Sequence, residues 1–175
     1  MDYAVLKKNF ENHRFHTSYF ETKEEAAAYL AEQIKGETVG FGGCMTAKEM
    51  DLFEILKKNN EVIWHWEQGP DARIRAKKES TVYILSANAA AETGQIINID
   101  GSGNRLSESL FGPKRVYYVI GKIRSRRICP PQWTAREISP VQRTRRVLIR
   151  RLHASCPMAK SAMTATVRSG SVTRS

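Results

Sequence analysis

Two glycine-rich stretches have the composition of loops that bind anions. The first, GFGGCMT at residues 40–46, contains Gly40, Gly42, Gly43 and Thr46. A turn of this kind between a strand and a helix points backbone N–H groups at the positive end of the helix dipole, which favours phosphate or carboxylate. Its spacing is neither the dinucleotide fingerprint nor the phosphate loop of nucleotide hydrolases. The alternative is that these glycines only make a tight turn.

The second stretch, DGSGNR, occupies residues 100–105. Backbone amides around glycines can form a nest for an anion, and an arginine can hold a carboxylate or phosphate through two parallel hydrogen bonds. The alternative is a turn in which the aspartate bonds its own backbone. The candidate ligand-binding residues of this stretch are Asp100, Gly101, Gly103, Asn104 and Arg105.

A third candidate site follows a run of apolar residues that ends at Leu85. Ligands of open α/β sheets lie beyond the carboxyl ends of the strands, and Asn88, which can donate and accept hydrogen bonds, lies at such a position. Glu92 lies four residues further on and is a candidate nucleophile or base. The alternative is a capped turn with a solvated glutamate.

Residues 1–122 alternate between helical and strand patterns, which predicts one α/β domain with a mainly parallel sheet flanked by helices. The sequences Thr22–Glu25 and Thr46–Glu49 each fit a capping box, in which Thr and Glu cap the start of a helix. Helices are expected over 3–12, 22–36, 46–58 and 105–111, with a short basic helix ending at Lys78. Strands are expected over 15–20, 38–41, 61–66, 81–85, 95–99 and 115–120.

The net charge of +10 comes from the end of the chain. Residues 1–122 hold 16 Lys and Arg against 17 Asp and Glu, whereas residues 123–175 hold 12 against one. The tail keeps neither a helical nor a strand period for long, and its composition predicts poor order. A basic tail could bind nucleic acid, but Trp133 is its only aromatic residue and gives little support for base stacking. The sequence therefore disfavours a nucleic-acid partner without removing this alternative.

Other features of the sequence argue against membranes and metals. No apolar run of 18 residues is present, and residues 1–25 have no signal-peptide core. The three cysteines Cys44, Cys129 and Cys156 are far apart, so a CxxC metal pair is excluded. We expect a cytoplasmic protein without a metal or other cofactor. Cys44 is expected to be a small packing residue.

Four motifs together resemble the LUD domain, the lactate utilisation protein family. They are VGFGGCMT at 39–46, SANA with ETG at 86–94, INIDGSGNR at 97–105 and FGPK at 111–114, in that order over residues 1–122. The resemblance implies the fold shared by ribose-5-phosphate isomerase, glucosamine-6-phosphate deaminase and the CoA transferases. It also implies a role in oxidising L-lactate to pyruvate beside partner subunits that carry iron–sulfur clusters. The recurring positions of the family include the glycines, Asn88 and Glu92.

Three functions remain open. The chain is a subunit or accessory factor of lactate oxidation that binds a small anionic ligand, or a CoA or acyl transferase-like enzyme that uses Glu92, or a nucleic-acid binder that uses its tail. The CoA-transferase relatives use a glutamate nucleophile, so the second rests on analogy of fold.

The tail after Lys122 is interpreted as a shifted reading frame. Family members continue with Asn-Lys-Ile and end in a cysteine-rich segment. In the frame that begins at the third base of each codon, Met158-Ala159 must encode Gly and Met163-Thr164 must encode Asp, both of which fit that segment. Other codon pairs permit its cysteines in order. We hypothesise a frameshift at about Gly121–Ile123, so that a frame-corrected chain would carry zinc or an iron–sulfur cluster. The alternative is a divergent basic tail.

Overall fold

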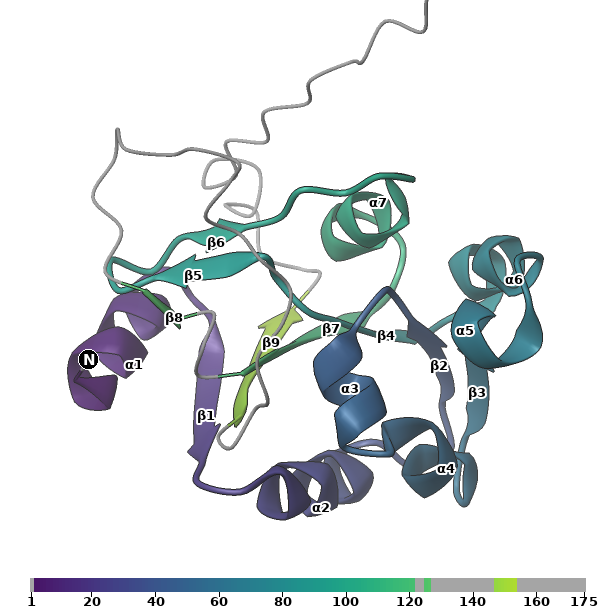
Figure 1. Ribbon diagram of the computed structural model, residues 1–175, viewed down its shortest axis with the longest axis horizontal. Coiled ribbons are helices and arrows are strands. Elements are labelled where there is room, and N and C mark those ends of the chain that lie inside the picture. The colour runs from purple at the N-terminus through teal and green to yellow at the C-terminus, as the bar shows by residue number, and fades with distance from the viewer. Residues whose placement is uncertain (1, 122–124, 127–146, 154–175) are drawn as a thin grey trace, which may run out of the picture.

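The computed structural model describes residues 2–121, 125–126 and 147–153 (Figure 1). The helices are α1 (Tyr3–Asn12), α2 (Lys23–Gln33), α3 (Met45–Glu49), α4 (Leu52–Lys57), α5 (His65–Gln68), α6 (Ala72–Glu79) and α7 (Asn104–Leu110). The strands are β1 (His16–Phe20), β2 (Thr38–Phe41), β3 (Glu61–Trp64), β4 (Val82–Leu85), β5 (Ala89–Ala91), β6 (Ile96–Ile97), β7 (Arg115–Gly121), β8 (Ser125–Arg126) and β9 (Val147–His153).

The main sheet has the order β1-β9-β7-β4-β2-β3. The four strands β7, β4, β2 and β3 run parallel, with Gly40 of β2 opposite both Ile63 and Tyr83. Strand β9 is antiparallel to both of its neighbours. The predicted α/β fold with a mainly parallel sheet and flanking helices is therefore confirmed.

Helices cover both faces of this sheet, because the buried strand residues alternate between two apolar clusters. One cluster joins Phe41, Trp64 and Ile84 to α2, α3 and α4. The other joins Ile63, Tyr83 and Leu85 to α1, α6 and strand β5. A smaller sheet of β6, β5 and β8 lies beside α1 in Figure 1. Because β2, β3 and β4 run parallel, their carboxyl ends lie at the same edge of the main sheet.

The first capping box forms and the second does not. Thr22 accepts from the Glu25 amide at 3.2 Å, and the Glu25 side chain reaches back to the Thr22 amide, so α2 begins as predicted. At the next helix the N-cap is Cys44, whose Sγ accepts from the Ala47 amide at 3.3 Å. The prediction that Thr46 caps this helix is wrong, because the glycine turn ends early enough for the helix to start at Met45.

Other elements also differ from the expected ones; for example, α2 ends at Gln33 and β6 covers only Ile96–Ile97. The helix expected over 46–58 is broken in two at Asp51, whose φ of 54° is left-handed. The strand expected over 61–66 ends at Trp64, because the Gln68 side chain accepts from the Trp64 amide at 3.0 Å and so closes the short helix α5. Strand β5 was not predicted, because its three residues are alanines and alanine has a low β-propensity. The strand forms through pairing with β6 and β8.

Part of the tail belongs to the main sheet. Residues 147–153 form β9 between β1 and β7, so poor order does not hold for that stretch, whose sequence VLIRRLH contains β-branched residues. Cys129, Trp133, Cys156 and the proposed frameshift position after Gly121 lie outside the described residues.

Candidate functional site

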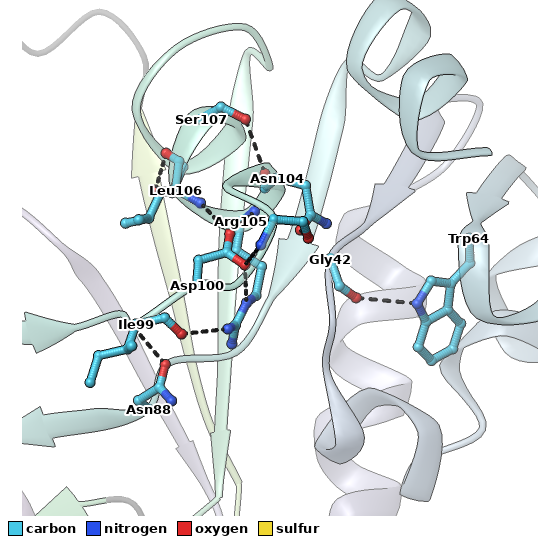
Figure 2. Close-up of polar contacts among 11 residues, drawn as sticks. Gly42, Trp64, Asn88, Ile99, Asp100, Asn104, Arg105, Leu106 and Ser107 are labelled. Carbon is cyan, nitrogen blue, oxygen red and sulfur yellow. Dashed lines mark hydrogen bonds and ion pairs between the residues drawn. The ribbon is translucent and has the colours of Figure 1, made fainter. Parts of the chain in front are cut away.

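The structure brings the two predicted glycine loops into contact. Gly42 directly follows β2, and a Cβ atom placed on it would lie 2.8 Å from Arg105 Cγ and 3.2 Å from Leu85 Cβ. Only glycine lets the backbone approach this closely, which is the physical reason for its presence. Figure 2 shows Gly42 beside the loop that carries Asp100 and Arg105.

The backbone of Gly42 is already held by the protein. Its amide donates to the Ile84 carbonyl at 2.8 Å, and its carbonyl accepts from Trp64 Nε1 at 3.2 Å (Figure 2). Beyond it, a Cβ on Gly43 would lie 3.5 Å from Trp66 Cζ2, and Trp66 is 38% exposed. The loop therefore runs between the Arg105 side chain and the Trp66 ring, and the two hydrogen bonds of Gly42 fix its backbone in place.

Asp100 organises the second loop. Its Oδ2 accepts from the amides of Arg105 at 2.7 Å and Leu106 at 3.3 Å (Figure 2). Its Oδ1 accepts from the Ser102 amide at 3.4 Å. The side chain is only 4% exposed. These bonds satisfy orphan amides at the start of α7, so Asp100 positions the loop, as the alternative interpretation of this turn expected.

Arg105 keeps hydrogen-bond donors for a ligand. Its Nε lies 3.7 Å from Asp100 Oδ1, and its Nη2 donates to the Ile99 carbonyl at 2.8 Å (Figure 2). Its Nη1 donates to no residue in the described part of the chain. An arginine has five donors in a planar fork, so this side chain is oriented by two contacts and retains donors for a carboxylate or phosphate.

The remaining glycines and Asn104 of this loop have different surroundings. Gly103 has a φ of 78° and precedes α7, and Gly101 is exposed with open space around it. The Asn104 carbonyl accepts from the Ser107 hydroxyl at 3.2 Å. The Asn104 side chain also lies close enough to Tyr83 of strand β4 to lower the pKa of the Tyr83 hydroxyl.

Asn88 and Glu92 lie at opposite ends of β5. Asn88 Oδ1 accepts from the Ile99 amide at 2.9 Å (Figure 2), so it fixes the segment that leads into Asp100. Glu92 lies in the turn between β5 and β6, where its carbonyl accepts from Asn9 Nδ2 of α1 at 2.8 Å. The structure therefore joins Asn88 to the second loop, whereas the Glu92 backbone contacts α1.

Two predicted residues have packing roles. A Cβ on Gly40 would lie 2.1 Å from Ser80 Oγ and 2.8 Å from Tyr83 Cδ2, so this glycine allows the end of α6 to pack on the sheet. Thr46 is 2% exposed within α3. Cys44 is buried, in agreement with its expected packing role.

Tyr83 is a site residue that the sequence analysis missed. It is 2% exposed on β4, and its Cε1 would lie 3.4 Å from a Cβ on Gly42. Burial raises the pKa of its hydroxyl well above the ordinary value; the Asn104 side chain opposes this rise, and the nearby Glu108 carboxyl adds to it. The hydroxyl therefore remains neutral and able to donate a hydrogen bond.

Glu108 of α7 is a second missed residue. It is 2% exposed, and its Oε1 accepts from Ser107 Oγ at 3.1 Å. Burial raises the pKa of the carboxyl, against smaller opposing effects of the Ser107 hydrogen bond and the Lys77 charge. Its Oε2 has no hydrogen-bond partner among the described residues. The spacing of Asn104 and Glu108, four residues apart on one helix, was a signal that they share a face.

The site combines the Arg105 cation with the Asp100 carboxylate and two further polar groups. These are the Tyr83 hydroxyl and the Glu108 carboxyl, whose pKa values are both raised by burial. This set suits a small carboxylate that carries another oxygen. Within the described ranges, no group of three His, Cys, Asp or Glu is placed to hold a metal ion, and no helix is long and apolar enough to cross a membrane.

Comparison with known proteins identifies the family. Neither a curated protein nor a solved structure matches the chain. The family model of the LUD domain matches residues 3–127, well over half of the sequence, and this range contains both loops, Tyr83 and Glu108. The chain therefore belongs to the LUD domain family.

Proposed function

We propose that this chain is a cytoplasmic subunit or accessory factor in the oxidation of L-lactate to pyruvate, and that it binds a small anionic ligand where Gly42 meets Arg105. The family is associated with lactate utilisation. The observation that carries the ligand site is the contact between Gly42 and Arg105, which brings together two loops that are about sixty residues apart in the sequence.

The chemistry of Arg105 fits this ligand class. Lactate and pyruvate each carry a carboxylate, which a guanidinium can bind through two parallel hydrogen bonds. Asp100 and the Ile99 carbonyl orient the guanidinium before a ligand arrives. A side chain that is already oriented loses less conformational entropy on binding, so a smaller entropic cost opposes the favourable interaction with the ligand.

The reaction itself requires partners. Oxidation of lactate to pyruvate removes two electrons and two protons, and in this proposal subunits with iron–sulfur clusters accept the electrons. The chain described here would hold the carboxylate or regulate the complex. A frame-corrected chain would add a cysteine cluster to this arrangement.

Calorimetric titration with L-lactate and with pyruvate tests the ligand site. Arg105→Ala should weaken binding of both by on the order of tenfold or more, because a charge-assisted hydrogen bond contributes about 1.5–3 kcal/mol. Arg75→Ala is the matched control, since Arg75 is an exposed residue of α6 that pairs with Glu61 and Glu79. Equal affinities of the Arg105→Ala and Arg75→Ala proteins would contradict the proposed site.

Growth on L-lactate tests the biological role. A strain that lacks its own copy of this gene should be complemented by the frame-corrected version, and comparison with the chain as written shows whether the tail matters. If neither version restores growth, the assignment to lactate oxidation is wrong.

A further inference from the structure

A stack of aromatic rings reaches the surface beside the first glycine loop. The Trp64 ring stacks on Phe41, with ring centroids 4.7 Å apart, and on Trp66, with centroids 5.3 Å apart and planes at 25°. Trp64 also donates to the Gly42 carbonyl (Figure 2). Phe41 and Trp64 are buried, whereas Trp66 is 38% exposed. The stack therefore ends in a ring that has one face on Trp64 and its remaining surface open to solvent.

Gly43 leaves the neighbouring part of the Trp66 ring uncovered. Its φ lies outside the left-handed region. Among the described residues, a Cβ placed on it would meet only Trp66 Cζ2, at the ordinary contact distance of 3.5 Å. Neither backbone conformation nor lack of space therefore requires a glycine here, in contrast to Gly42. The effect of the missing side chain is to keep this side of Trp66 open.

The backbone of Gly43 offers a donor and an acceptor beside that ring. Neither its N–H nor its C=O hydrogen-bonds another residue in the part of the chain that the structure describes, and the residue is partly exposed. A plain aromatic side chain from a partner protein would leave both groups unused. A purine base carries both kinds of group on its edge; adenine, for example, presents its N6 amino donor next to its N7 acceptor. The surroundings of Trp66 therefore favour a purine as its occupant.

We propose that Trp66 and Gly43 bind the base of a purine nucleoside or nucleotide, which stacks on the open face of Trp66 and hydrogen-bonds the Gly43 backbone through its edge. Ligands of open α/β sheets lie beyond the carboxyl ends of the strands. Gly43 lies two residues after β2, and Trp66 two residues after β3. The inference goes beyond the proposed function, since neither lactate nor pyruvate has a ring, and it does not involve Arg105.

Calorimetric titration of the full chain with adenosine, and with ribose as the ligand that lacks the base, tests this site. The unaltered protein should bind adenosine saturably and ribose not at all. Trp66→Ala should weaken adenosine binding about tenfold, within the range for stacking one base on an aromatic side chain, and Trp66→Phe should retain most of the affinity. Phe111→Ala is the matched control, because Phe111 is an aromatic residue that is 90% exposed at the end of α7. Equal affinities of the Trp66→Ala and Phe111→Ala proteins for adenosine would overturn the proposal.

Nuclear magnetic resonance of the unaltered ¹⁵N-labelled chain gives a second readout that does not depend on how well Trp66→Ala folds. The indole Nε1–H signal of Trp66, assigned by its disappearance in Trp66→Phe, should shift saturably with adenosine and stay in place with ribose. Adenosine binding without a shift of this signal, or no adenosine binding at all, would overturn the proposal. Titration of the same sample with L-lactate tests the proposed function separately, so intact lactate binding beside a failed adenosine titration would overturn the purine site alone.

Discussion

At the scale of single residues, the site depends on one close approach of backbone to side chain. Gly42 lets Arg105 and Leu85 pack against β2 without a side chain between them. A glycine pattern in a sequence indicates such a position but does not show which residue approaches it. Arg105 was predicted as a ligand-binding residue, whereas its contact with Gly42 depends on packing between distant segments.

Gly42→Ala tests this approach. The new methyl group would lie 3.2 Å from Leu85 Cβ and closer still to Arg105, so we expect a loss of about 1–3 kcal/mol in the free energy of unfolding together with weaker carboxylate binding. Gly101→Ala is the matched control, because a Cβ there meets nothing within 4 Å. Urea unfolding measures the effect, and equal stability of the two variants would contradict the described contact.

Glu108 also predicts how stability depends on pH. Because the folded-state pKa of its carboxyl is raised, the folded protein holds this proton more tightly than the unfolded chain. Its contribution is therefore most favourable below the unfolded pKa and declines as pH rises through the folded pKa. Glu108→Gln should become progressively more stable relative to the unaltered protein as pH rises from the ordinary pKa of a glutamate through the raised folded-state pKa, after which the difference should level off. Urea unfolding at several pH values measures this difference, and a constant difference would contradict the burial of an ionisable group.

At the scale of elements, the starts of two helices show how well a local sequence pattern predicts the first residue of a helix. Thr22 and Thr46 each precede a glutamate by three residues, yet only Thr22 caps its helix. The sequence around Thr46 obeys the local rule, but the turn after Gly43 and the burial of Cys44 place the helix start earlier. Local patterns therefore predict that a helix exists better than they predict its first residue.

The first amides of helix α7 are capped by Asp100, which lies three residues before the N-cap Gly103. Asp100 accepts from the Arg105 and Leu106 amides, so Asp100→Ala should lower the free energy of unfolding by about 0.5–2 kcal/mol and displace Arg105. Asp71→Ala is the control, because Asp71 is the N-cap of α6 without a side-chain capping bond. Thermal unfolding and lactate titration measure both effects. Equal losses in the two variants would show that Asp100 has no special role.

The position of helix α7 explains why the sequence predicted the loop at 100–105 but not Tyr83 and Glu108. The loop at 100–105 carries recognisable glycines, so its residues were candidates from the start. Tyr83 lies in an apolar strand, and Glu108 follows the motif by one helical turn. Their proximity arises only when α7 packs beside β4, a contact between segments more than twenty residues apart.

At the scale of the whole molecule, the change in charge lies close to the end of the family match. Residues 1–122 carry a net charge of −1 and the remainder +11, and the LUD match ends at residue 127. The proposed shift of reading frame near Gly121 lies a few residues before that end. Residues 147–153 nevertheless fill a place in the sheet as β9, which the composition of the tail did not predict.

The proposed frameshift predicts a difference in metal content. The frame-corrected chain should purify with zinc or an iron–sulfur cluster, since its tail would supply closely spaced thiolates, and the chain as written should not. Metal analysis and absorbance of the two purified proteins measure this difference. Equal metal content would contradict the proposal, as would genomic sequence that supports one uninterrupted frame through codon 122.

The central claim is that Arg105, set against Gly42, binds the carboxylate of the ligand. Nuclear magnetic resonance of the ¹⁵N-labelled chain tests this most directly through the Nε–H signal of Arg105, assigned by its disappearance in Arg105→Lys. Titration with L-lactate should shift this signal in a saturable way and leave that of Arg75 unchanged. Saturable lactate binding without any change at Arg105 would contradict the claim.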